Sequence, residues 1–280
     1  MGGFFLITRI VSGLVGMALT VFVVHFGSYV FGAAVFLLAL IGWHEFSRAF
    51  ANKGEKLAYV TGMVAIVFIL GCAWLGNAEE SVAVITAATL WVLMQMIFRH
   101  RFFSVEQACL SIAGIMYVGM AFSHLLLLRF TGSDAFTASG AMSLPVGEAL
   151  LWLAFIGTWA SDTFAFFTGS FLGRHKLCPE ISPNKTIEGF AGGLIGTVGI
   201  TVLFGYLFSF SLIHMVALGI LLALTATLGD LVESSFKRYT GIKDSGALIP
   251  GHGGVLDRFD SIMFTVPLVY YYVQIFDILK

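Results

Sequence analysis

Charged residues are scarce in this chain, and their scarcity argues against a soluble domain. Only 11% of the 280 residues are charged, whereas 58% are hydrophobic and the mean hydropathy is +0.94. A typical soluble domain has about 25% charged residues, because water has to cover its surface. We therefore expect an all-α integral membrane protein.

An excess of positive charge and clustered cysteines are also lacking. Fifteen basic residues stand against 16 acidic ones, for a net charge of -1, which argues against nucleic acid as a partner. The three cysteines, Cys72, Cys109 and Cys178, form neither a CxxC pair nor a cluster at metal-ligand spacing. No Ser/His/Asp or Cys/His nucleophile arrangement is evident either.

Long apolar runs, by contrast, fill the chain. A helix needs about 20 apolar residues to cross the hydrocarbon core. Nine segments approach that length, at residues 10–25, 28–44, 58–76, 81–98, 105–128, 149–171, 188–208, 211–232 and 259–277. We interpret the first as a transmembrane helix, not a cleaved signal peptide, because no small-residue cleavage site follows it.

The basic residues predict how these spans are oriented. With the N-terminus in the cytoplasm, all but two of the 15 lysines and arginines fall on the cytoplasmic side, the exceptions being Arg129 and Lys280. The positive-inside rule therefore favours nine spans with the C-terminus on the far side. We expect a multi-pass protein of the inner, cytoplasmic membrane, with its active site facing the cytoplasm.

Acidic residues in or beside spans gather in the second half of the chain. We therefore divide it into residues 1–130, with about five structural spans, and 148–280, with about four catalytic spans and cytoplasmic loops at 172–187 and 233–258. Carboxylates are expensive in lipid and face a cavity or a partner. A structural ion pair of any one acid with Arg258 or Lys237 remains an alternative.

Three of these acids are expected at one membrane depth. Helical spacing puts Ser234 and Lys237 on the face of Asp230, while Asp257 and Asp260 share a face at the start of the last span. Carboxylates without thiolates suit Mg²⁺ better than zinc. Because Mg²⁺ fills its other positions with water and phosphates, we expect a phosphate-bearing substrate.

The 233–258 loop supplies groups that bind phosphate. Its cationic donors are Lys237, Arg238, Lys243 and Arg258, and its glycines, Gly251, Gly253 and Gly254, let backbone N–H groups approach phosphate oxygens. We also assign Asp244 and His252 to the substrate site.

The 172–187 loop offers a second anion site. Ser182 followed by Pro183 predicts a helix start with Lys185 in its first turn, and Thr186 is adjacent. The following span carries Gly189, Gly192, Gly193, Gly196 and Gly199, a stripe that would let a neighbouring helix approach closely. Asp162, inside its own span, either lines the cavity or bonds to a neighbouring span.

The stretch SSFKRYTGIKDSGALIPGHGGVLDRFD, residues 234–260, resembles the signature of the phosphatidate cytidylyltransferase (CDP-diacylglycerol synthase) family. The shared elements are S-x-x-K-R, K-D, P-G-H-G-G and D-R-x-D. The earlier DTFAFFTGSFLGRHKL and ISPNKTIEG are similar to that family's as well.

The resemblance implies transfer of CMP from CTP to phosphatidic acid, giving CDP-diacylglycerol and pyrophosphate in phospholipid biosynthesis. It implies Mg²⁺ on Asp230 and Asp257 with Asp260 nearby, a second, monovalent cation such as K⁺, and a homodimer in the bilayer. Lys237, Arg238 and the Lys185 loop would hold phosphates.

Two other functions remain open from the residues alone. A lipid kinase would need similar metal and phosphate machinery but would release a nucleoside diphosphate. An ion-coupled transporter could use Asp162 and Asp230 as an ion relay and would consume no CTP.

Overall fold

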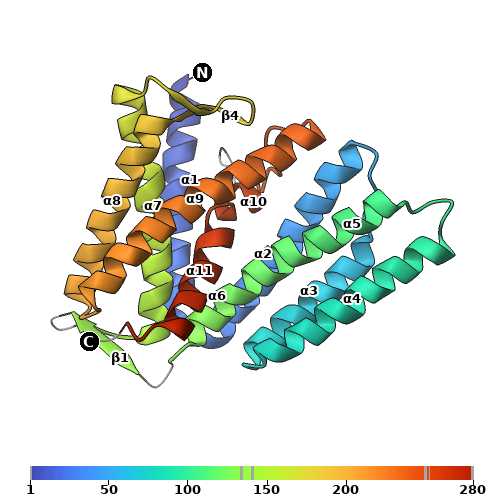
Figure 1. Cartoon of the computed structure of the whole chain (residues 1–280), viewed down its shortest axis with the longest axis horizontal. Coiled ribbons are helices and arrows are strands. Elements are labelled where there is room, and N and C mark those ends of the chain that lie inside the picture. The colour runs from blue at the N-terminus through green and yellow to red at the C-terminus, as the bar shows by residue number, and fades with distance from the viewer. Residues whose placement is uncertain (1, 133–134, 140–141, 249–250, 252, 279–280) are drawn as a thin grey trace. The chain divides into compact units, whose positions relative to one another are not determined.

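The computed structural model describes residues 2–132, 135–139, 142–248, 251 and 253–278, which form helices and two short β-hairpins (Figure 1). The helices are α1 (Gly2–Phe26), α2 (Ser28–Asn52), α3 (Tyr59–Trp74), α4 (Ala78–Phe98), α5 (Val105–Gly114), the π-helix η1 (Ile115–Met120), α6 (Ala121–Phe130), α7 (Val146–Leu172), α8 (Ile187–Leu207), α9 (Leu212–Thr240), α10 (Leu256–Phe259) and α11 (Ile262–Ile275). Strand β1 (Phe136–Ser139) pairs antiparallel with β2 (Met142–Pro145), and β3 (Lys176–Cys178) pairs antiparallel with β4 (Ser182–Thr186).

Six helical stretches of the described chain are long and apolar enough to cross a membrane. They are Ser28–Asn52, Glu79–Phe98, Val105–Phe130, Val146–Leu172, Ile187–Leu207 and Leu212–Thr240, and shorter apolar helices cover Val11–Phe26, Tyr59–Trp74 and Ile262–Ile275. Large apolar side chains such as Phe171 and Ile195 are exposed on them, as lipid contact requires. The expected all-α membrane class is confirmed, while the nine-span count and the sides of the termini stay predictions.

The chain packs as two compact units. The first comprises Met1–Leu127 and Lys237–Phe259, and the second comprises Leu128–Phe236 and Asp260–Lys280. Helix α9 passes from the second unit to the first between Phe236 and Lys237. The signature stretch therefore contributes residues to both units. The sequence-based division at 130 and 148 names regions by expected role, and it stays a prediction.

In the second unit, α7 and α8 lie side by side because glycines remove side chains from their contact (Figure 1). A Cβ atom at Gly189 would lie 2.9 Å from the Ala165 carbonyl oxygen, and one at Gly193 would lie 3.0 Å from that of Ser161. Gly199, in contrast, has nothing within 4 Å of such an atom. The predicted small-residue stripe is thus confirmed where it meets α7, and Gly199 lies outside the contact.

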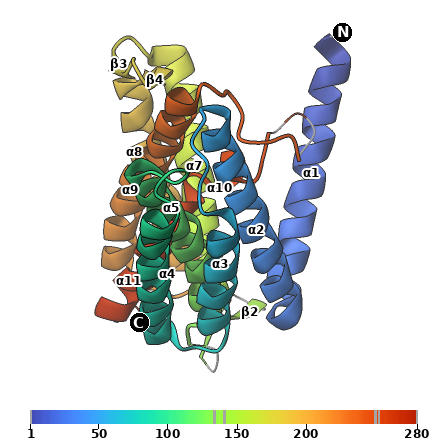
Figure 2. The same ribbon diagram turned by 90° about the vertical axis from the view of Figure 1, so that its right-hand side faces the viewer.

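The segment before α8 differs from the sequence prediction. Ser182 does not cap a helix, and Lys185 is not in a first turn: both lie in β4 (Figure 2). The helix begins at Ile187 instead, and the Thr186 side chain accepts a hydrogen bond of 3.0 Å from the Gly189 N–H. Because β4 keeps the backbone extended from Ser182 to Thr186, Thr186 is the residue that directly precedes the helix and can cap it.

The sequence predicts that the last span starts as one helix, whereas the structure has a break in the helix at that point. Helix α10 ends at Phe259 and α11 begins at Ile262, so Asp257 and Asp260 do not share a face of one continuous helix. The Ser261 hydroxyl donates to the Ala226 carbonyl at 3.0 Å, which ties the start of α11 to α9 within the second unit. This hydrogen bond holds the start of α11 against α9.

In the first unit, α2 is held in place by a buried tryptophan. Trp43 is fully buried, and its ring occupies the space that a side chain at Gly62 of α3 would fill. Its indole N–H donates to the Tyr59 carbonyl at 2.9 Å, and Phe46 packs at Gly114 of α5 in the same way. Helix α2 is therefore fixed at the level of Glu45.

Candidate functional site

The second unit contains a cavity of about 670 Å³ at the end of α7, α8 and α9 that carries the β3–β4 hairpin. Its wall combines apolar side chains with polar side chains that carry oxygen or nitrogen atoms. The polar wall residues include Asp162, Ser182, Asn184, Lys185, Thr186 and Asp230. Three stretches far apart in sequence, in α7, in the hairpin with the start of α8, and in α9, thus contribute to one cavity. Five of these six side chains were predicted as site residues.

Lys185 and Asp230 form an ion pair on the cavity wall. The Lys185 Nζ lies 2.6 Å from Asp230 Oδ2, and both side chains are partly exposed, at 23% and 31%. The Ser234 hydroxyl donates to Asp230 Oδ1 at 3.2 Å from the next turn of α9, which confirms the predicted shared helix face. The cavity therefore presents a cation and an anion next to each other, each within reach of solvent.

Asp162 lies on the cavity wall and is exposed. The expected place on a cavity wall is therefore confirmed, and a bond from Asp162 to a neighbouring span stays a prediction.

The β3–β4 hairpin is fastened to the first turn of α8 by one carboxylate. Glu188 Oε2 accepts the backbone N–H groups of Arg174 at 3.0 Å and of His175 at 3.2 Å. Its other oxygen, Oε1, contacts His175 Nδ1 at 2.5 Å. These bonds fix both ends of the hairpin, and with them the position of Lys185 over the cavity. Sequence reasoning did not single out Glu188.

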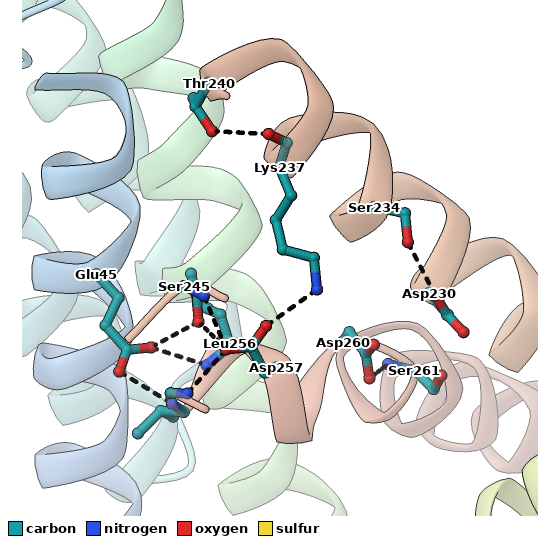
Figure 3. Close-up of polar contacts among 12 residues, drawn as sticks. Glu45, Asp230, Ser234, Lys237, Thr240, Ser245, Leu256, Asp257, Asp260 and Ser261 are labelled. Atoms are coloured by element: carbon teal, nitrogen blue, oxygen red, sulfur yellow. Dashed lines mark hydrogen bonds and ion pairs between the residues drawn. The ribbon is translucent and has the colours of Figure 1, made fainter. Parts of the chain in front are cut away.

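Asp257 is the centre of a second polar cluster, within the first unit (Figure 3). The Lys237 ammonium donates to Oδ1 at 3.0 Å, while Oδ2 accepts three bonds of 2.8 Å, from the Ser245 N–H, the Ser245 hydroxyl and the Gly254 N–H. The Asp257 side chain is 4% exposed. The two carboxylate oxygens thus have different partners: one binds the loop and the other a single ammonium.

These partners keep Asp257 ionised. Burial alone would raise the pKa of the carboxyl group. The hydrogen bonds from Gly254, Lys237 and Ser245, together with the charge of Lys237, outweigh that effect and hold the pKa below the ordinary value of 3.8. Asp257 therefore carries its negative charge throughout the neutral range.

Glu45 of α2 joins the same cluster and was missed from the sequence. It is 5% exposed and accepts the N–H groups of Val255 and Leu256 at 3.0 Å each, and the Ser245 hydroxyl at 3.2 Å (Figure 3). The predicted span ended at residue 44, which placed Glu45 in a loop, whereas α2 continues to Asn52. The sequence signal available for Glu45 was an acidic residue within a helix that continues beyond it.

The remaining predicted residues lie at various places around these contacts. Asp260 Oδ1 accepts the Ser261 N–H at 2.7 Å in the second unit. Arg238 is exposed in the last turn of α9, and Lys243, Asp244 and Arg258 are exposed in the 241–258 segment. Gly253 has a positive φ of 83°, and the Gly254 N–H already donates to Asp257. His252 lies outside the described residues.

The predicted metal ligands, Asp230 and Asp257, belong to different units, and their joint role stays a prediction. Among the described residues, no group of three or more His, Cys, Asp or Glu side chains is arranged to hold a metal ion. Mg²⁺ needs only one or two carboxylates when water and phosphate supply the rest. The oxygen donors on the cavity wall, with Asp230 partly exposed among them, fit that requirement.

The chain is similar in sequence to known proteins over most of its length. The cytidylyltransferase family matches residues 7–276 of the chain. A phosphatidate cytidylyltransferase of Synechocystis sp. is 33% identical over 95% of both chains. The chain is likewise similar to the enzymes of that name from Staphylococcus haemolyticus, at 36% identity over 84% of this chain and 86% of the relative, and Bacillus subtilis, at 30% over 96% and 97%.

Proposed function

Because this chain belongs to the cytidylyltransferase family, we propose that it transfers CMP from CTP to phosphatidic acid, giving CDP-diacylglycerol and pyrophosphate. A phosphate oxygen of phosphatidic acid attacks the α-phosphorus of CTP, and the bond to the β-phosphate oxygen breaks. The phosphate monoester is already ionised near neutral pH, so the attack needs no strong base. The main difficulty is bringing two anions together, which positioned positive charge overcomes.

The cavity with the Lys185–Asp230 pair is the observation that carries this proposal. Lys185 supplies a cation at the wall, and the oxygen and nitrogen groups of Ser182, Asn184 and Thr186 surround it. When a phosphate enters, the Lys185 ammonium exchanges its carboxylate partner for a phosphate oxygen. We assign to Lys237 and Arg238 a second set of contacts with substrate phosphates.

Mg²⁺ is part of the proposal, with Asp230 and Asp257 as the residues that would hold it. Bound there, it would supply positive charge to phosphate oxygens that become more negative as the bond breaks. The support is chemical: both groups are carboxylates, and Oδ1 of Asp257 has only the Lys237 ammonium as its described partner, whereas Oδ2 serves the loop. A monovalent cation such as K⁺ and a homodimer rest on the resemblance alone.

The proposal also includes a place for the reaction. We infer that the protein lies in the inner membrane with nine spans, and that the cavity opens to the cytoplasm. The distribution of lysine and arginine supports this orientation, and it would let CTP arrive from water while the lipid arrives from the bilayer.

A direct assay tests the function. Detergent-purified protein is incubated with phosphatidic acid, Mg²⁺ and cytidine-labelled CTP, and pyrophosphate and labelled lipid are both measured. We expect equal amounts of the two products and neither product without the lipid. Release of CDP would indicate a lipid kinase, and a folded protein that yields no product with several lipids would contradict the proposal.

A further inference from the structure

Glu45 is a buried acid that the proposed reaction does not yet use. It comes from α2, about 200 residues before the loop that it contacts, and it lies in the first unit together with that loop. Both of its oxygens accept hydrogen bonds: Oε1 from the Val255 N–H, and Oε2 from the Leu256 N–H and the Ser245 hydroxyl. Two adjacent backbone groups of the loop therefore depend on one side chain.

Two glycines let the loop approach Glu45 this closely. A Cβ atom at Gly246 would lie 2.3 Å from Glu45 Oε1, and one at Gly254 would lie 2.4 Å from the same oxygen. Neither glycine has a positive φ. They are therefore needed for contact with a carboxylate of the protein itself, which is a different use from the phosphate contact expected of Gly254.

Ser245 connects Glu45 to Asp257. Its single hydroxyl proton is shared between Glu45 Oε2, at 3.2 Å, and Asp257 Oδ2, at 2.8 Å, and its N–H donates to the same Asp257 oxygen. Gly254, whose N–H is a further donor to Asp257, directly precedes the Val255 that Glu45 holds. Glu45 and Asp257 thus both accept hydrogen bonds from Ser245 and from the segment Gly254–Leu256.

We propose that Glu45 is a positioning residue for Asp257. By fixing Val255, Leu256 and Ser245, it keeps the donors to Asp257 Oδ2 in place, and this orients Oδ1 toward Lys237. Asp257 Oδ1 is then held in one orientation, and it is the oxygen that we assign to the proposed reaction. This inference rests on the proposed function, since it gives Asp257 a role in that reaction.

The Glu45→Gln substitution tests the inference with little change in size. A glutamine has one acceptor oxygen, and its NH₂ group would face the Leu256 N–H or the Val255 N–H, donor against donor. Glu148→Gln is the matched control, because Glu148 is also buried, at 3% exposure, and accepts from Arg129 at 3.0 Å far from this loop in sequence.

Residue-resolved hydrogen exchange gives a readout that is independent of activity. In Glu45→Gln we expect the N–H groups of Ser245 and Gly254 to exchange at least about 10-fold faster, although both donate to Asp257 and neither donates to Glu45. In Glu148→Gln they should exchange as in the unaltered protein. If Ser245 and Gly254 keep their protection in Glu45→Gln, the positioning inference is wrong.

Kinetics then separate positioning from simple loss of fold. We expect Glu45→Gln to lower kcat per folded molecule by about 10- to 100-fold, the range that a misplacement near 1 Å produces, with KM for both substrates changed less than about 3-fold. Glu148→Gln should leave kcat per folded molecule unchanged. An unchanged kcat in folded Glu45→Gln would overturn the inference.

Gly246→Ala is the substitute variant if Glu45→Gln does not fold. It keeps the Glu45 carboxylate, but the added Cβ atom of the loop pushes that carboxylate out of its place. The same faster exchange and the same fall in kcat are expected, and normal values for both would count against the inference. Failure of the proposed function itself is distinguishable: the unaltered protein would then form no CDP-diacylglycerol, whereas the exchange result would stand by itself.

Discussion

The two oxygens of Asp257 have separate tasks, and asparagine cannot perform both. In Asp257→Asn, the one remaining oxygen can accept from the loop or from Lys237, and the NH₂ group faces donors on the other side. We expect turnover to fall at least about 100-fold. The measurement is formation of labelled lipid per folded molecule. Near-normal activity would remove Asp257 from the proposed reaction.

Lys185 should act mainly on nucleotide binding. Its ammonium is on the cavity wall, so Lys185→Ala removes one charge-assisted contact with phosphate, worth about 1.5–3 kcal/mol. We expect KM for CTP to rise by about 10- to 100-fold. Lys176→Ala is the control, because Lys176 is exposed on the neighbouring strand and is not among the cavity-wall residues. Equal effects of the two substitutions would contradict the role of Lys185.

The ionised state of Asp257 sets a pH dependence for the loop. Because its folded-state pKa is lowered, its contribution to stability is fully present above the ordinary value of 3.8 and is lost as pH falls below that value. We expect protection factors for the Ser245 and Gly254 N–H groups, corrected for intrinsic exchange, to be constant from pH 7 to pH 5. A loss of protection within that range would contradict this expectation.

At the level of elements, the contact between α7 and α8 fixes one wall of the cavity. Gly193→Leu places a side chain against the Ser161 carbonyl, whereas Gly199→Leu adds the same side chain where nothing lies within 4 Å. We expect Gly193→Leu to destabilise by about 1–3 kcal/mol and to lower the midpoint of thermal unfolding in detergent, with no such change in Gly199→Leu. Equal midpoints would show that the close contact does not matter.

The positions of the apolar elements could be predicted from the sequence because the lipid requirement is strong and local. Each of the segments from 28–44 to 211–232 corresponds to a helical stretch, and 105–128 is formed by α5, η1 and α6 in succession. The start of α8 could not be predicted, because Ser182 and Thr186 are both acceptable caps and only the pairing of β4 with β3 decides between them. Ser234 beside Asp230 followed from helical spacing, whereas the sequence left Asp162 either on a cavity wall or bonded to a neighbouring span. The contacts of Glu45 with the loop depend on tertiary packing and could not be predicted.

On the scale of the whole molecule, membrane orientation is still a prediction, and a native cysteine can test it. Cys178 ends β3 in the loop expected to face the cytoplasm. With Cys72 and Cys109 replaced by serine, we expect a membrane-impermeant maleimide to label Cys178 in inside-out vesicles and not in right-side-out ones. Thr131→Cys in a background that also lacks Cys178 should give the opposite pattern. Labelling of Cys178 from the outer face would reverse the orientation.

The two lysine–aspartate pairs have a consequence for the order of events. Lys185 is paired with Asp230, and Lys237 is paired with Asp257. A lone divalent cation arriving at either acid meets an ammonium, and a lone triphosphate arriving at either lysine meets a carboxylate. If the metal and the nucleotide bind as proposed, a nucleotide that brings its own cation would offer a phosphate oxygen to the lysine and a cation to the aspartate of a pair. Under the proposed function, the pairs would therefore favour binding of the metal–nucleotide complex over binding of either component alone.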